Sequence, residues 1–94
     1  MTTYRDLEDR VITAGGMLQV TVEQLRELEG AGKLGAHVRD AIRHNLHQRG
    51  LATLEGAIPN DQRATLWLIS AKTQWGAMLL DVVREIRNSP RRAA

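Results

Sequence analysis

The chain lacks cysteine and phenylalanine, has only two prolines and two serines, and contains no long apolar run. Without cysteine it can form neither a disulfide nor a thiolate zinc site, and it has no thiol nucleophile. The longest apolar runs, at 66–69 and 77–80, have four residues each, whereas a membrane-spanning helix needs about 18. Charged residues at 5–9 stand where a secretory signal would be apolar. We therefore expect a soluble cytoplasmic protein.

Catalytic motifs are also lacking. Neither serine lies in a Gly-x-Ser-x-Gly turn. The glycine-rich segment 30–33 lacks the spacing of a phosphate-binding loop and the hydroxyl residue that should follow it. We therefore predict that the chain is not an enzyme and uses no cofactor.

The charges are unevenly distributed along the 94 residues. The formal net charge is only +2, but residues 31–50 carry four cations against one acid, and residues 71–94 carry five against two. Such asymmetry favours an anionic partner. The length allows one domain with a modest core, which we expect to span residues 1–90, with residues 91–94 as a basic tail.

Apolar periodicity and turn residues predict the order helix–strand–helix–helix–strand–strand–helix. Thr21 and Gln24 form a capping box that opens the second helix. We expect Trp67 and Trp75 in the core, and the last strand to be buried on both faces. The helices are expected at residues 4–14, 34–49 and 74–88, with a short helix between the cap at Thr21 and the turn at Gly30, and the strands at residues 17–20, 51–54 and 64–69.

Two segments resemble parts of a known family. Residues 18–25, LQVTVEQL, resemble the strand that leads into the second helix of a winged helix-turn-helix domain. Residues 41–51, AIRHNLHQRGL, are similar to the exit from that family's recognition helix into its wing. Over residues 4–88 the chain thus resembles the DNA-binding domains of bacterial transcriptional regulators. This resemblance implies a mainly α fold with a small β-hairpin wing.

The resemblance also implies sequence-specific binding of double-stranded DNA by a nucleoid-associated regulator, with the helix at 34–49 in the major groove. Opposite the apolar stripe of this helix lie cations and histidines that can reach bases or phosphates. Arg39 and Arg43 are the foremost of these. The full set of expected DNA-binding residues is Lys33, Ala36, His37, Arg39, Arg43, His44 and His47, with Asn60, Gln62 and Arg63 from the wing.

The last predicted helix has an apolar arc of about 200°, which is wider than one small core covers. We expect a second copy of the chain to cover the remaining apolar surface. The resulting homodimer would hold its two copies of the helix at 34–49 about 34 Å apart. Alternatively, the first helix of the same chain covers it. The residues expected at the dimer interface are Met78, Leu79, Leu80, Val83 and Ile86.

Two further interpretations stay open. The acidic first segment and the two acids in the wing favour a winged-helix protein–protein interaction module that does not bind DNA. Alternatively, His37, Asp40, His44 and His47 fall within about 80° of one helix face, a spacing compatible with zinc or nickel binding or with pH sensing. Because no cysteine or His-Glu-x-x-His pattern supports a metal site, we predict none.

Overall fold

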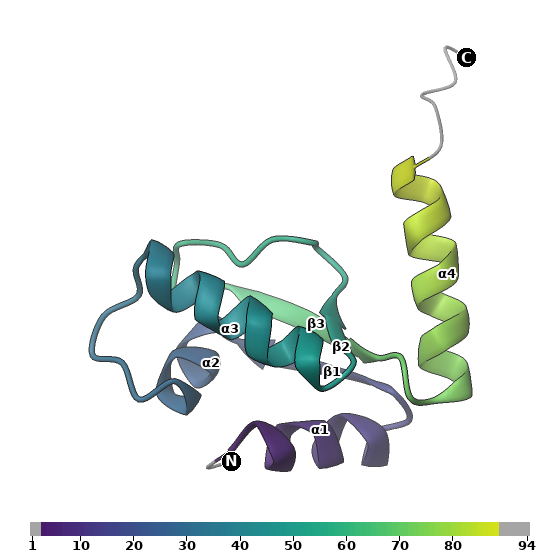
Figure 1. Ribbon diagram of the computed structural model, residues 1–94, viewed down its shortest axis with the longest axis horizontal. Helices are drawn as coiled ribbons and strands as arrows, with labels where there is room; N and C mark the ends of the chain where they lie inside the picture. The colour runs from purple at the N-terminus through teal and green to yellow at the C-terminus, as the bar shows by residue number, and fades with distance from the viewer. Residues whose placement is uncertain (1–2, 89–94) are drawn as a thin grey trace.

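The computed structural model describes residues 3–88 and consists of four helices and a three-stranded antiparallel sheet (Figure 1). The elements follow the predicted order, and each predicted boundary lies within about two residues of the observed one. Within this range no helix is both long enough and apolar enough to cross a membrane. The helices are α1 (Tyr4–Thr13), α2 (Val22–Leu28), α3 (Ala36–Gln48) and α4 (Gln74–Asn88), and the strands are β1 (Met17–Thr21), β2 (Leu51–Thr53) and β3 (Thr65–Ser70).

Side-chain caps explain where several helices begin. The hydroxyl of Thr3 accepts a hydrogen bond from the Asp6 amide at the start of α1. The predicted capping box of α2 is confirmed, since Thr21 and Gln24 each bond to the other's backbone amide. Helix α3 has no such cap. It begins two residues later than predicted, because Gly35 is extended there.

The sheet has the order β1–β3–β2, and helices α1, α2 and α3 contribute to a core on one of its faces. At the start of β3 the side chains alternate between buried and exposed, since Leu66 is buried and Trp67 is 37% exposed. The prediction that this strand is buried on both faces holds for its second half, where the neighbouring Leu68 and Ile69 are both fully buried. It is wrong for the first half, and Trp67 is not in the core, because its side chain lies on the face of β3 opposite the core. The core residues are Leu7, Val11, Val20, Val22, Leu25, Ile42, Leu46, Leu51, Ile58, Leu66 and Leu68.

The loop between β2 and β3, residues 54–64, folds back onto the rest of residues 3–73, which we call the body. Ile58 is only 4% exposed and belongs to the core. The far end of the loop is tied to the start of α2, where the amides of Val22 and Glu23 donate to the carbonyls of Ala64 and Gln62 at 2.9 and 3.1 Å. The hairpin is thus present, but its loop is held against the helices.

Two polar clusters join α1 to the rest of the body. Glu8, itself buried, accepts from Lys72 Nζ at 2.6 Å and from Arg49 Nη1 at 3.4 Å. The hydrogen bond from Lys72 is the main reason why the pKa of Glu8 lies below its ordinary value. At the other end of α1, the Tyr4 hydroxyl donates to Glu29 at 2.6 Å. Burial is the main cause that raises the pKa of Tyr4.

Helix α4 leaves the body at the end of β3 and projects away from it (Figure 1). Thr73 caps this helix as its sequence position suggests, because its hydroxyl accepts from the Gly76 amide at 2.9 Å. A Cβ atom at Gly76 would collide with the Ser70 carbonyl, so only glycine fits this close approach. Trp75 is 54% exposed, and its expected place in the core is also wrong.

Candidate nucleic-acid interface

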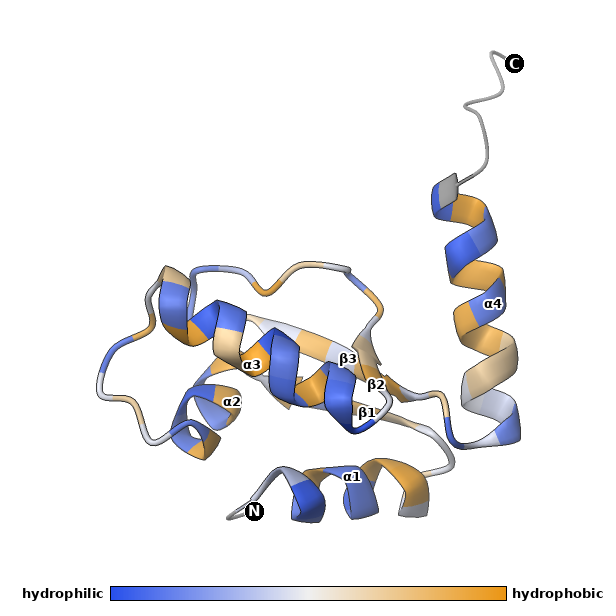
Figure 2. Ribbon diagram, viewed as in Figure 1, coloured by the Kyte–Doolittle hydropathy of each residue, from blue (hydrophilic) through white to orange (hydrophobic). Residues whose placement is uncertain are grey.

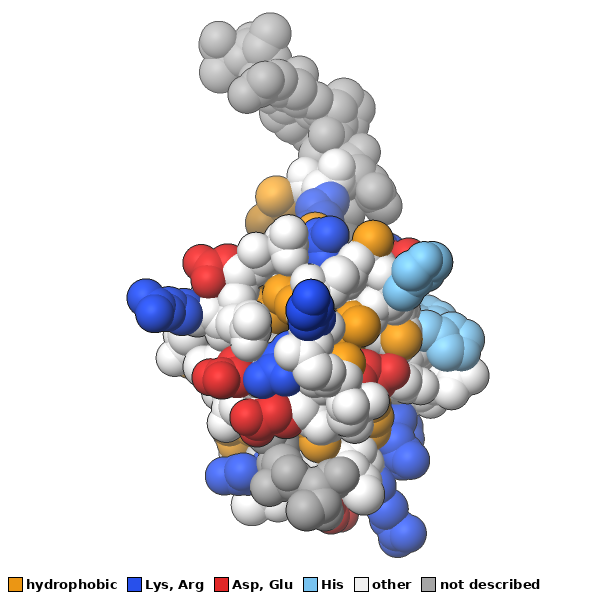
Figure 3. Space-filling model, turned by 90° about the vertical axis from the view of Figure 1, so that its left-hand side faces the viewer, with side chains coloured by type: hydrophobic (Ala, Val, Ile, Leu, Met, Phe, Trp, Pro, Cys, Tyr) orange, Lys and Arg blue, Asp and Glu red, His pale blue; other side chains and the backbone are white. Residues whose placement is uncertain are grey.

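Burial of Ile42 and Leu46 fixes which side of α3 faces solvent. Most side chains on the opposite side are exposed, as the sequence predicted, and Arg39 is the exception. In the space-filling view the histidines gather along one edge of the molecule (Figure 3). On the face shown there, Lys and Arg side chains are interspersed with Asp and Glu. The exposed residues from this predicted set are Lys33, Ala36, His37, Arg43, His44 and His47.

Arg39 differs from its neighbours because it is half-buried. Its Nε atom is buried and has no hydrogen-bond partner among the described residues. The side chain lines a hollow of about 160 Å³ together with Ala57 and Ile58 of the β2–β3 loop. Arg39 is therefore less available to a nucleic acid than Arg43.

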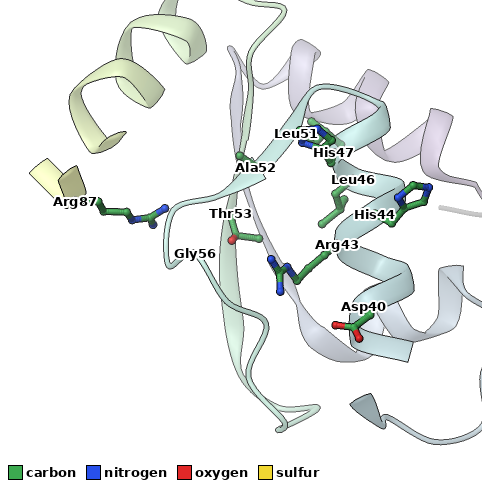
Figure 4. Close-up of a pocket in the computed structure, with 10 residues that line it drawn as sticks. All are labelled: Asp40, Arg43, His44, Leu46, His47, Leu51, Ala52, Thr53, Gly56 and Arg87. Carbon is green, nitrogen blue, oxygen red and sulfur yellow. The ribbon is translucent and has the colours of Figure 1, made fainter. Parts of the chain in front are cut away.

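A groove of about 500 Å³ lies beside the C-terminal half of α3. It is bounded by α3, by β2 with the loop that follows, and by the end of α4. Arg43 and Arg87 extend toward this space from opposite sides, whereas His44 points away from it (Figure 4). The polar residues of the groove are Asp40, Arg43, His44, His47, Thr53 and Arg87.

Arg87 is held in place by the loop after β2. Its Nη2 atom donates to the carbonyl of Leu54. Its guanidinium also lies against Gly56, where an added Cβ would stand 3.2 Å from Cζ. Gly56 has a φ of +86°, a conformation that glycine adopts without strain. One donor of Arg87 is thus used internally, and its guanidinium carries four further N–H donors.

Such a pair of guanidinium groups suits a phosphate or carboxylate, because Arg donates in a planar fork that matches both anions. Asp40, the single carboxylate among the residues of 3–88 that line the groove, offsets part of the positive charge. We expect the groove to favour an extended anionic chain over a compact dianion, because its cations stand on opposite sides.

The predicted contacts from the β2–β3 loop lie elsewhere. Asn60, Gln62 and Arg63 are all exposed, but none of them lines the groove. Gln62 is tied to α2 through its carbonyl, and the Arg63 amide donates to Asp61 at 3.0 Å. The structure therefore does not bring these residues together with Arg43. The arginines of the predicted basic tail, Arg91 and Arg92, lie outside the described residues.

Sequence reasoning missed Arg87 and Thr53 as groove residues. The excess of cations in 71–94 was a signal for Arg87, but it did not indicate that α4 would turn this side chain back toward β2. For the histidines, residues 3–88 contain no group of three His, Cys, Asp or Glu side chains that could hold a metal ion.

Comparison with known proteins yields no match, since no family model, curated protein or solved structure is significantly similar to this chain.

Proposed function

We propose that this protein binds double-stranded DNA through α3 and the adjoining groove, as a winged-helix transcriptional regulator of the cytoplasm and nucleoid. One observation carries the proposal. Arg43 and Arg87, which stand on two helices far apart in the sequence, face one groove beside an exposed helix that bears further cationic and histidine side chains. The order of helices and strands supports it as well.

The dimensions of α3 suit a major groove. Its 13 residues give a length of about 20 Å, and a DNA major groove of about 12 Å width admits one helix. Ala36 at its exposed start allows close approach, and Arg43 offers donors for guanine or phosphate. Arg87 and Lys33 then act as phosphate contacts, which supply affinity without sequence information.

We propose further that a homodimer binds the DNA. Each copy offers only a few cations near α3, so a single copy should bind weakly. Two copies double the number of phosphate contacts and read two half-sites. Helix α4 offers an exposed apolar surface for such pairing.

Three alanine variants test the DNA contacts. We expect Arg43→Ala and Arg87→Ala each to weaken binding to a labelled duplex roughly 10-fold and to lower the slope of log affinity against log salt by about 1 per copy. Arg84→Ala is the matched control, because Arg84 is exposed, pairs with Asp81 at 3.9 Å and does not line the groove. Equal losses in all three variants would show only a general effect of charge and would contradict the proposed interface.

The other function to consider is that of a protein–protein interaction module. The exposed apolar side of α4 and the acids near α3 and the loop, Asp40 and Glu55, favour it. Failure of the folded protein to bind any duplex at low salt would support this function instead.

A further inference from the structure

Helix α4 exposes an unusual amount of apolar surface. Hydrophobic residues recur along α4 after its first turn, and most of the helix projects from the rest of the fold (Figure 2). Of the six large apolar side chains that are exposed among residues 3–88, four belong to this helix. They are Trp75 at 54%, Met78 at 58%, Val82 at 54% and Ile86 at 70% exposure.

The body accounts for only part of the apolar arc of α4. Gly76 packs against Ser70, and Arg87 reaches Leu54, so the side of the helix that carries Gly76 and Arg87 faces the body. Leu80 and Val83 point toward this side, so neither is part of the surface argued here; both are half-buried, as is Leu79 at the edge of the exposed side. The exposed residues are centred roughly 120° away from them.

The exposed side has the spacing of a helix-pairing seam. Trp75, Leu79, Val82 and Ile86 follow one another at intervals of four, three and four residues, which is the alternation found at the contact positions of paired helices. This spacing reads the same in both directions. A second copy of α4 can therefore match it in either orientation.

We propose that α4 pairs in antiparallel orientation with α4 of a second copy, so that Trp75 packs against Ile86 of the partner subunit. Leu79 then packs against Val82 of the partner subunit. This inference rests on the proposal that the protein is a homodimer, and it adds the seam and its direction.

Side-chain volume favours the antiparallel direction. Each layer then combines a larger with a smaller side chain, whereas a parallel pair would stack Trp75 on itself and Val82 on itself. A pair of two large side chains causes strain, and a pair of two small ones leaves a void. Both lower the stability of the dimer. The helix dipoles act in the same sense, because an antiparallel pair places each positive N-terminus beside a negative C-terminus.

The available area sets the expected strength. At roughly 200 Å² for a large side chain, the exposed parts of Trp75, Met78, Val82 and Ile86 amount to about 450 Å² per copy. A standard interface buries about 800 Å² per partner. Since the available area is smaller than this, we expect a weak dimer that dominates only at high protein concentration.

Sedimentation equilibrium without DNA tests the seam. We expect the wild-type protein to dimerise and Ile86→Ala to weaken the dimer at least 10-fold, whereas Arg84→Ala, on the opposite side of α4, leaves it unchanged. Trp75→Ala combined with Ile86→Ala should be monomeric, and circular dichroism should show that the body remains folded. A wild-type protein that stays monomeric at several hundred micromolar would overturn the proposal and assign this surface to a different partner.

Disulfide trapping tests the direction. Because the chain has no cysteine, Trp75→Cys and Ile86→Cys each introduce a single thiol, and a disulfide requires Cα atoms within about 7 Å. We expect an oxidised mixture of the two variants to cross-link one chain of each kind, with little cross-linking in either variant alone. Efficient cross-linking of each variant with itself would show a parallel pair. Since neither experiment contains DNA, failure here is distinct from failure to bind DNA.

Discussion

Residues 3–73 and helix α4 both carry apolar side chains at regular spacing, but these side chains are covered differently. In the body, Leu7 and Val11 of α1 and Ile42 of α3 are fully buried. In α4, Val82 and Ile86 continue the same kind of stripe and remain largely exposed. An amphipathic pattern therefore shows that a helix face is suited to packing, and it does not show whether the same chain or another provides the partner.

The body and α4 also have different roles. The body contains the hydrophobic core and presents α3, whereas α4 extends the groove with Arg87 and exposes the proposed pairing seam. Pairing of α4 would restrict the position of Arg87, because both features belong to one helix. DNA binding and dimerisation would then be coupled through α4.

The largest expected difference between the two regions concerns stability. We expect Leu66→Ala, in the fully buried part of β3, to lower the free energy of unfolding by about 2–5 kcal/mol, because it leaves a cavity in the core. Ile86→Ala should lower it by less than about 0.5 kcal/mol in the monomer. Urea denaturation at low micromolar concentration or below measures both. Similar losses would mean that α4 is part of the body's core.

A substitution at the junction between the body and α4 should lower the free energy of unfolding by an intermediate amount. We expect Gly76→Ala to cost about 1–3 kcal/mol, because the added methyl group meets the Ser70 carbonyl. This loss would oppose the gain of about 1 kcal/mol that alanine brings to a helix. Gly32→Ala is the control, since nothing lies within 4 Å of the added atom, and it should raise stability by about 0.5 kcal/mol or leave it unchanged. Thermal unfolding that shows stabilisation by both changes would contradict the close packing of α4 on the end of β3.

A smaller effect than at Gly76 is expected at Glu8, whose carboxylate ties the turn before α4 to α1. We expect Glu8→Gln to lower the free energy of unfolding at neutral pH by about 1 kcal/mol, since its partners Lys72 and Arg49 are partly exposed.

The pH dependence of this effect has a definite sign. The pKa of Glu8 is lowered in the folded protein, so the unfolded chain takes up the proton first as the pH falls. The contribution of Glu8 is complete above the unfolded pKa of about 4.3 and is lost as the pH falls through the folded value. Wild type and Glu8→Gln should therefore converge in stability under acid. A difference that stays constant between pH 7 and pH 3 would contradict this ion pair.

Much of the fold was predictable because its signals are local. The capping box of Thr21 and Gln24 and the stripe with Ile42 and Leu46 depend only on neighbouring residues, and both are observed. The burial of Ile58 was not predicted, because a single large apolar residue between Gly56 and Pro59 gives no periodic signal. An isolated large apolar residue in a polar loop was the available clue.

The candidate site was predictable in part for the same reason. The exposure of Arg43 follows from the stripe on its own helix. The position of Arg87 depends on how α4 leaves β3, which is set by the contact of Gly76 with Ser70. The exposure of Trp67 and Trp75 depends on which faces other elements leave open, and this is a property of the assembled fold.

The most direct test of the central claim is the binding of a labelled random-sequence DNA duplex by the wild-type protein, followed by fluorescence anisotropy at two salt concentrations. With Arg43 and Arg87 contacting phosphates in each half of a dimer, we expect the affinity to fall about 100-fold between roughly 50 and 200 mM salt. Binding of that kind would agree with a DNA interface on α3 and the adjoining groove. A folded, dimeric protein that does not bind the duplex even at the lower salt concentration would contradict it.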